Sequence, residues 1–231
     1  MNKDNGAVLK YLKDHNSKSF YFSLNDELDN CCFKEKEKIL FKKNGKELFR
    51  CNVSDVKIKG EHNLANAMAV ICAAKIFNLD NPKIIKALQA FEGVEHRLEP
   101  VREIDGVKFF NDSKATNVDS VWYALKSFDE PILLILGGQD KGNDYEQIKA
   151  LVIERVKKIY AIGSSAEKIF SFFDSLVKVE IKKSIEDVIT SVIKEARQGD
   201  VVLLSPACAS FDMFDNYEHR GEVFKKAVNS L

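Results

Sequence analysis

The chain has 231 residues, which is enough to bury a substantial core and to form one large or two modest domains. Hydrophobic residues make up 45% of it and charged residues 30%, values of an ordinary globular protein that argue against disorder. The 35 basic and 35 acidic side chains balance, so neither nucleic acid nor a membrane surface is expected as a partner.

Cysteine usage and the first residues indicate the compartment. The five cysteines are odd in number and lack the spacing of a zinc site, so we expect neither a disulfide framework nor a structural metal. Residues 1–5 carry no apolar signal-type segment, and no run is long enough to span a bilayer. We therefore expect a soluble, cytoplasmic protein, and we expect a monomer.

Residues 1–60 carry short, charged elements. We expect a helix over Gly6–Asp14 and a strand over Ser19–Ser23. Two further apolar segments flank Asn44-Gly45, the kind of dipeptide that most strongly favours a hairpin turn. Because an isolated hairpin is only marginally stable, we expect this region to be the end of a larger sheet and looser than the rest of the chain.

A helix of small apolar residues is expected to begin near Gly60 and to continue through Phe77, and a second helix follows it to Phe91. Asn63 and Asn66 lie one turn apart near the start of the first helix. We expect one of them to cap the helix and the other to contact a ligand.

Glycine and proline bracket the charged segment 92–100, which we expect to be a hinge between domains 1–93 and 94–231. Beyond it, short apolar strands alternate with amphipathic helices, a pattern typical of an α/β fold with a Rossmann-like, doubly wound, mostly parallel sheet. Ser164 and Glu167 have the spacing of a capping box. The expected strands are Val107–Asn111, Ile132–Leu136, Val156–Ile162, Val177–Ile181 and Val201–Leu204, and the expected helices lie near 117–128, 145–154, 165–174, 185–196 and 217–230.

Polar residues gather directly after three of these strands, in the loops 112–117, 137–142 and 205–210. Since the carboxyl ends of parallel strands share one edge of a sheet, we expect the three loops to converge. They offer ammonium and hydroxyl groups beside the N–H groups of helix starts, which suits recognition of an anion. The side chains concerned are Lys114, Thr116, Lys141 and Ser210.

A protein nucleophile is not expected. The chain has no G-x-S-x-G elbow, and no base can be named beside Cys208, so a partly buried structural thiol is favoured over a reactive one. No G-x-x-x-x-G-K-[ST] motif is present either, so the chain by itself lacks the loop that wraps a nucleoside triphosphate.

Taken together and in order, the motifs of this chain resemble those of the Mur ligase family. They are Gly60-x-His62-Asn63-x-x-Asn66-x-x-Ala69, Glu95-His96-Arg97, Asn111-Asp112-Ser113-Lys114-Ala115-Thr116-Asn117, Gly137-Gly138-x-Asp140-Lys141-Gly142, Leu204-Ser205-Pro206-Ala207-Cys208-Ala209-Ser210-Phe211-Asp212 and Tyr217-Glu218-x-Arg220-Gly221. Within the family the combination is most similar to the D-glutamate-adding members. A phenylalanine is usual there at the position of Tyr217, where this chain keeps an aromatic ring.

The resemblance implies a three-domain enzyme. This chain would cover the end of the central ATP-binding domain and the complete C-terminal, amino-acid-binding domain. The P-loop and the magnesium ligands of the family are expected upstream of Met1, so the isolated chain is expected to be inactive. The implied reaction uses ATP to join D-glutamate to UDP-N-acetylmuramoyl-L-alanine in peptidoglycan synthesis, through an acyl phosphate.

The resemblance also implies roles for individual residues. Lys114, near the phosphates, and Arg97 would serve catalysis. The residues implied at ATP are Asn63, Asn66, His96, Arg97 and Asp112, of which Asp112 would hold the ribose hydroxyls. Those implied at D-glutamate are Thr116, Lys141 and Ser210, with help from the backbone around Tyr217.

Two alternatives stay open at this point. One is a non-catalytic module that binds a nucleotide or an amino acid, and the other is a different ligase of the Mur or folylpolyglutamate type. The loop 205–210 and the segment Gly137–Gly142 favour the D-glutamate-adding type over the second alternative.

Overall fold

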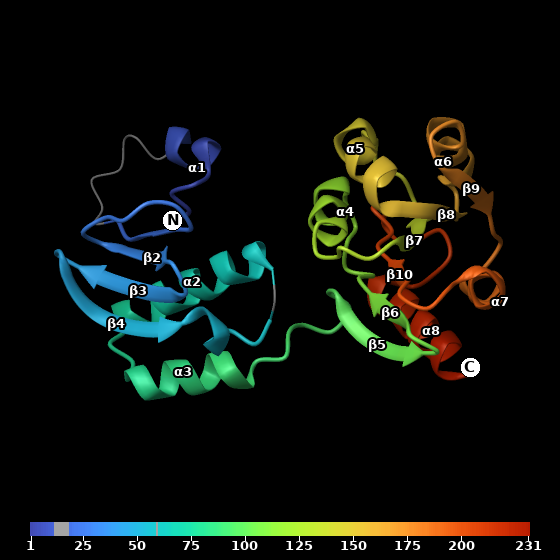
Figure 1. The fold of residues 1–231 in the computed structure, drawn as a ribbon. Coiled ribbons are helices and arrows are strands. Elements are labelled where there is room, and N and C mark those ends of the chain that lie inside the picture. The colour runs from blue at the N-terminus through green and yellow to red at the C-terminus, as the bar shows by residue number, and fades with distance from the viewer. Residues whose placement is uncertain (12–18, 59) are drawn as a thin grey trace. The chain divides into compact units, whose positions relative to one another are not determined.

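The computed structural model describes residues 1–11, 19–58 and 60–231. The chain divides into two compact units, Met1–Glu92 and Gly93–Leu231, and each contains one β-sheet (Figure 1). In this part of the chain, no helix has both the length and the apolar surface that crossing a bilayer requires.

The first unit is built on a four-stranded sheet with the order β1-β2-β3-β4. The pair β1 and β2 is parallel, and the other neighbours are antiparallel. One core joins strand residues Ile39, Phe41 and Phe49 with residues of α2 such as Met68 and Ile71. The elements of this unit are α1 (Gly6–Tyr11), β1 (Tyr21–Ser23), β2 (Cys31–Glu35), β3 (Lys38–Lys43), β4 (Lys46–Asn52), the short 3-10 helix η1 (Val53–Asp55), α2 (Glu61–Ile76) and α3 (Asn81–Ala90).

The hairpin around Asn44-Gly45 is confirmed, since β3 and β4 pair antiparallel and both turn residues have positive φ, 52° and 72°. The sheet of this unit has more strands than expected. The sequence pattern did not predict β2, which pairs with β3 and with β1 and so completes four strands. Residues 12–14 of the expected first helix lie outside the described residues.

The second unit is built on a six-stranded sheet with the order β5-β6-β10-β7-β8-β9, in which only the edge pair β5 and β6 is antiparallel. Helices α4, α5 and α6 contribute to the core on one face, and α7 and α8 to the core on the other (Figure 1). The expected doubly wound, mostly parallel α/β fold is therefore confirmed. The elements are β5 (Glu99–Ile104), β6 (Val107–Asn111), α4 (Val118–Leu125), β7 (Ile132–Gly137), α5 (Glu146–Arg155), β8 (Val156–Ile162), α6 (Ala166–Phe173), β9 (Lys178–Ile181), α7 (Ile185–Glu195), β10 (Val201–Leu204) and α8 (Tyr217–Asn229).

The last strand of the chain, β10, lies between β6 and β7. Its residue Leu204 is in register with Asn111 of β6 and with Ile135 of β7. All four of its residues are fully buried, as expected for a strand covered on both faces of a parallel sheet. The carboxyl ends of β6, β10 and β7 therefore lie side by side at one edge.

Two local expectations about this unit were wrong. Residues 99–104 form the edge strand β5, which pairs with β6, although 99–100 were expected within the hinge and 101–104 were assigned to no element. Ser164 does not cap α6, because the N-cap residue is Ser165 and the Ser164 hydroxyl donates to the carbonyl of Gly138 over 3.2 Å. The Ser164 hydroxyl thus makes a long-range hydrogen bond instead of the helix cap that its sequence spacing predicted.

We expect the amides of Val201–Leu204 to exchange with solvent more slowly than those of the hairpin around Asn44-Gly45. The first segment pairs with a strand on each side and is fully buried, whereas β4 is an edge strand with several exposed residues. Hydrogen exchange followed by NMR measures both segments in one sample. Equal protection of the two would contradict this expectation.

Candidate functional site

Three loops meet at the carboxyl ends of β6, β7 and β10. Gly137 N donates to Pro206 O over 2.9 Å, and Gln139 and Ala209 exchange two N–H···O bonds of 2.9 and 3.2 Å. The loop after β6 is tied to the same edge, because Asp112 N donates to the carbonyl of the last residue of β10 over 2.7 Å. Backbone bonds therefore hold the three loops together before any side chain contributes.

Gly137 and Gly138 allow the loop after β7 to approach its neighbours closely. Their φ angles of 121° and 136° lie in a region that other residues rarely adopt. A Cβ on Gly137 would lie 2.1 Å from Ile162 O, and one on Gly138 would lie 2.4 Å from Ala209 O. Both obstacles are backbone atoms that cannot swing aside, so the glycine pair is required by this contact.

Asp112 is buried at the end of β6. Its carboxylate accepts a hydrogen bond from Ser205 Oγ over 2.8 Å and one from Leu98 N over 3.2 Å. Burial raises the pKa of Asp112 to about 7, although these two bonds and the charge of Arg97 act in the opposite direction. Each carboxylate oxygen keeps a second lone pair that can accept a further hydroxyl.

His96 packs against the loop after β6. It is buried, with a φ of 63°, and its Nδ1 lies 2.9 Å from Asn111 Nδ2. Because an amide nitrogen can only donate, Nδ1 is the acceptor in this contact. The carbonyl of His96 accepts from Lys114 N over 3.0 Å, and a Cβ on Gly221 would lie 2.2 Å from the ring. Arg97, the next residue, is exposed.

One group of potential metal ligands occurs among the described residues. It consists of Glu95, His96 and Glu99, whose ligand atoms lie within 4.8 Å of one another. Lys225 Nζ already pairs with both carboxylates, at 2.7 Å each. His96 Nδ1 already accepts from an asparagine amide. The Lys225 ammonium thus neutralises the two carboxylates that a metal ion would need. We therefore assign none of the described residues to a metal ion.

Lys114 and Tyr217 are brought together by the fold. Lys114 Nζ donates to the Tyr217 hydroxyl over 2.9 Å and lies 4.6 Å from the centre of its ring. Ser113 Oγ donates to the backbone carbonyl of Tyr217 over 2.8 Å. The start of α8 is therefore fastened to the loop after β6 through both its side chain and its backbone.

Arg220 is a candidate residue to which the sequence pattern assigned no role. It is fully buried, and it donates from Nε to Ser113 Oγ over 2.9 Å, from Nη2 to Ser113 O over 2.8 Å and from Nη1 to Cys208 O over 3.1 Å. A signal was present in the sequence. Arg220, Phe224 and Val228 recur at four-residue spacing, which places the arginine on the apolar face of α8.

The three side chains expected to bind carboxylates lie on different loops of the same edge. Ser210 is buried, Thr116 is half-buried and Lys141 is exposed. Asp140 shapes the turn that carries Lys141, because it accepts from the N–H groups two and three residues further on, over 3.0 and 2.8 Å, and pairs with Lys168. In the described chain no direct hydrogen bond joins the three.

Cys208 is buried, as expected, in the loop after β10. Its sulfur lies 3.2 Å from Asn143 Nδ2, 3.6 Å from Ser165 Oγ and 3.7 Å from the Tyr145 hydroxyl. Burial raises the pKa of the thiol. A protonated thiol among neutral partners is a poor nucleophile, which agrees with a structural role.

Asn63 and Asn66 belong to the first unit, in the first turns of α2. The N-cap of this helix is Gly60, so the expectation that one of the asparagines caps it was wrong. Asn63 is half-buried and Asn66 is exposed. The other predicted site residues all lie in the second unit.

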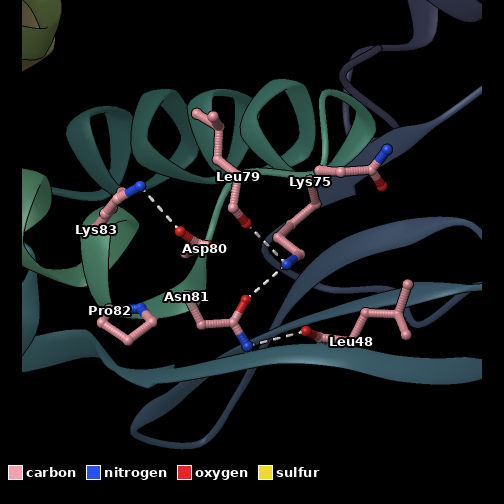
Figure 2. Close-up of a pocket in the computed structure, with 8 residues that line it drawn as sticks. Leu48, Lys75, Leu79, Asp80, Asn81, Pro82 and Lys83 are labelled. Atoms are coloured by element: carbon pink, nitrogen blue, oxygen red, sulfur yellow. Dashed lines mark hydrogen bonds and ion pairs between the residues drawn. The ribbon is translucent and has the colours of Figure 1, made fainter.

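A pocket of about 710 Å³ lies on the first unit, where α2 passes into α3 (Figure 2). Its charged side chains are already paired: Lys75 Nζ donates to Leu79 O over 3.1 Å and to Asn81 Oδ1 over 2.6 Å, and Lys83 pairs with Asp80 at 2.9 Å. None of the predicted site residues lines it. The strand-edge loops are therefore the better candidate site.

Known proteins resemble this chain over most of its length. Residues 96–208 match the family described as Mur ligase, glutamate ligase domain. The UDP-N-acetylmuramoylalanine--D-glutamate ligase of Chloroherpeton thalassium is 45% identical over 212 residues, which is 90% of this chain and 45% of that protein. The protein of the same name from Cytophaga hutchinsonii is 44% identical over 232 residues, which is 99% of this chain and 51% of that protein. The chain thus spans about half the length of the curated relatives it matches.

Solved structures share the fold at low sequence identity. UDP-N-acetylmuramate-alanine ligase MurC from Thermotoga maritima has a TM-score of 0.63 at 17% identity, covering 91% of this chain and 52% of its own. A pseudomurein peptide ligase type C from Methanothermus fervidus has a TM-score of 0.65 at 17% identity, covering 89% of this chain and 42% of its own. Folylpolyglutamate synthase from Mycobacterium tuberculosis, complexed with ADP, has a TM-score of 0.63 at 13% identity, covering 92% of this chain and 55% of its own.

We expect Tyr217→Phe to lower the free energy of unfolding by about 0.5–1.5 kcal/mol, the usual net value of one hydrogen bond. The variant removes only the hydroxyl that accepts from Lys114 and keeps the ring beneath the ammonium. Urea denaturation measures the change. In a Lys114→Met background the same substitution should have a smaller effect, because only the bond between the Tyr217 hydroxyl and the Glu218 carboxylate is then left to lose, and an undiminished loss there would exclude the lysine as a contributor.

We expect Asp112→Asn to change how stability depends on pH. In the folded state the carboxyl keeps its proton up to about pH 7, whereas in the unfolded chain it ionises near its ordinary pKa of 3.8. The stability due to the protonated group is fully present below the unfolded pKa and is lost as pH rises through the folded one, by up to about 1.4 kcal/mol per pH unit.

An asparagine cannot titrate, so the stability of Asp112→Asn relative to the unsubstituted chain should rise across that window. Urea denaturation of both proteins at about pH 4.5, 6 and 7.5 measures the difference, and contributions from all other groups cancel in it. A difference that stays constant with pH would show that Asp112 does not titrate in this range.

Proposed function

The chain belongs to the Mur ligase family through its residues 96–208, and from this premise we propose that it is the amino-acid-binding part of a cytoplasmic, monomeric ligase. The ligase would use ATP to join D-glutamate to UDP-N-acetylmuramoyl-L-alanine in peptidoglycan synthesis. Relatives at 44 and 45% identity that carry the name of this activity support the proposal. The structural observation that carries it is the convergence of three polar loops at one sheet edge.

We assign residues 94–231 to the amino-acid-binding domain and residues 1–93 to the end of the ATP-binding domain. The division of the chain into compact units after Glu92 supports this boundary. In this assignment the second unit brings the amino acid, and the first carries Asn63 and Asn66, which we assign to ATP. ATP and UDP-N-acetylmuramoyl-L-alanine are substrates, and magnesium would be held by residues outside this chain.

The residues proposed to contact the nucleotide differ in their burial and in the partners that they already have. Asp112 is buried with one lone pair free on each oxygen, which fits acceptance of ribose hydroxyls. Arg97 is exposed and its charge already acts on Asp112, so it can reach a phosphate beside it. Lys114 rests on a tyrosine and would exchange that partner for phosphate. The full proposed set is Asn63, Asn66, His96, Arg97, Asp112 and Lys114.

We place the two carboxylates of D-glutamate among Thr116, Lys141 and Ser210, with backbone groups around Tyr217. Two hydroxyl donors and one ammonium match the four acceptor oxygens of a dicarboxylate. The ammonium of Lys141 is exposed and makes no ion pair within the described residues, so it is available to an anion arriving from solvent.

The proposed reaction needs positioned charges and no protein nucleophile. The terminal phosphoryl group of ATP passes to the carboxylate oxygen of UDP-N-acetylmuramoyl-L-alanine and leaves ADP and an acyl phosphate. The amine of D-glutamate then attacks the acyl carbon, loses a proton, and expels phosphate as the amide forms. Cations such as Lys114 and Arg97 lower the barriers by stabilising the charge that develops on phosphate oxygens.

A chimera tests this proposal. In it, this chain replaces the matching half of the Cytophaga hutchinsonii relative, which supplies the remaining half of a ligase. We expect the chimera to form product from D-glutamate. Tight binding of ADP or D-glutamate without turnover would instead favour a non-catalytic binding module, and preference for another amino acid would favour another ligase of this superfamily.

Lys141→Ala in the chimera should remove a charge-assisted hydrogen bond worth about 1.5–3 kcal/mol. The KM for D-glutamate should then rise roughly ten-fold to over a hundred-fold, while the melting temperature hardly changes because the side chain is exposed. Lys178→Ala, which removes an exposed ammonium at the start of β9, is the matched control. Equal D-glutamate kinetics in the two variants would return Lys141 to the ordinary surface lysines.

A further inference from the structure

Arg220 is a buried cation without a counter-ion. Its side chain is fully buried, and all of its hydrogen bonds go to neutral acceptors, namely Ser113 Oγ, Ser113 O, Cys208 O and, at 3.4 Å, Ala209 O. Among the described residues no carboxylate lies within ion-pair distance of it, and Asp212 acts on it only from further away. Burial lowers the pKa of the guanidinium to about 10, so it stays charged at neutral pH.

Stability alone does not account for an arginine at this position. Removing a guanidinium from water costs several kcal/mol, and neutral carbonyls recover only part of that cost. Phe224 and Val228, on the same face of α8, lie in the core, but an apolar side chain at position 220 would leave the carbonyls of Ser113 and Cys208 buried without a donor. The arginine must contribute something that an apolar residue cannot.

That contribution is a fixed link between the loops of the site. Nε and Nη2 hold both the side chain and the backbone of Ser113, which lies three residues before Thr116. Nη1 holds two carbonyls directly before Ser210. The third loop passes close to the guanidinium, because a Cβ added to Gly138 would lie 3.2 Å from Nη1. One rigid, planar group thus binds two of the loops and lies beside the third.

We propose that Arg220 is a positioning residue that sets the separation between Thr116 and Ser210 and thereby determines the affinity for the amino-acid dicarboxylate. This inference rests on the function proposed above. The guanidinium itself is fully buried and is not expected to touch the substrate. Its effect is to hold two hydroxyl groups from distant segments of the chain at one spacing. Substrate binding then loses less conformational entropy, because the loops are already ordered.

The test uses Arg220→Lys in the chimera with the Cytophaga hutchinsonii half. Lysine keeps the charge but has a single ammonium, which cannot span Ser113 and the carbonyls before Ser210. We expect the KM for D-glutamate to rise roughly ten-fold or more, while the KM for ATP and kcat stay within about three-fold. Ser113→Ala removes the Oγ that accepts from Arg220 and donates to the Tyr217 carbonyl, but it keeps the Arg220 bonds to Ser113 O and Cys208 O, so it should raise the same KM by a smaller factor.

Lys158→Met is the matched control. Lys158 is also a buried cation, but it is paired with Glu180 and Glu195 and lies near the beginning of β8, away from the strand ends that carry the loops. This variant should lower the melting temperature without changing the KM for D-glutamate. A shift of all kinetic constants in proportion to melting temperature, in all three variants, would make Arg220 a structural residue only.

The possible failures are distinguishable. A cooperatively melting, unsubstituted chimera that does not ligate D-glutamate overturns the proposed function and this inference with it. An active chimera whose KM for D-glutamate is unchanged by Arg220→Lys overturns the positioning role alone. If Arg220→Lys does not fold, Ser113→Ala decides, and an unchanged KM in that variant overturns the role as well.

Discussion

The parallel pairing of β10 with both β6 and β7 is the interaction on which the second unit depends. β10 is the last strand of the chain, so its pairing with β6 and β7 closes long loops. The conformational entropy lost in closing them is offset by the hydrogen bonds and the burial of β10. Its four apolar residues are fully buried between the helices of the two faces. Only when β10 is in place does its following loop lie between the loops after β6 and β7, and the polar groups of three distant segments become neighbours.

The polar loops meet at the edge of a buried sheet, where water does not reach every polar group. Each buried polar group therefore needs a hydrogen-bond partner within the protein. Among the described residues, every buried side-chain nitrogen and oxygen has one. For the two ionisable groups at the centre, the partners are neutral: a hydroxyl and an N–H for Asp112, and a hydroxyl and carbonyls for Arg220. Because no ion pair offsets it, burial moves both pKa values toward the neutral form, upward for Asp112 and downward for Arg220.

The groups proposed to bind carboxylates differ in their exposure to solvent. Ser210 is buried in a loop held by backbone bonds and by Arg220, Thr116 is half-buried, and Lys141 is exposed at the tip of a turn shaped by Asp140. Such a gradient suits a charged ligand. The exposed ammonium attracts the anion from solvent, and the buried end offers hydroxyl donors whose positions are set before it arrives.

The sequence by itself determined the α/β class and the place of the polar loops, because strand and helix periodicities are carried by neighbouring residues and β7 and β10 are short apolar runs. It did not predict β5, whose mixed charged residues become a strand only by pairing with β6. It also misassigned Ser164, whose hydroxyl bonds to Gly138 rather than to its own helix. The α8 pattern placed Arg220 on an apolar face, yet its partners Ser113 and Cys208 come from other segments. Only the tertiary structure decided those contacts, because strand order, and not sequence proximity, determines which loops meet.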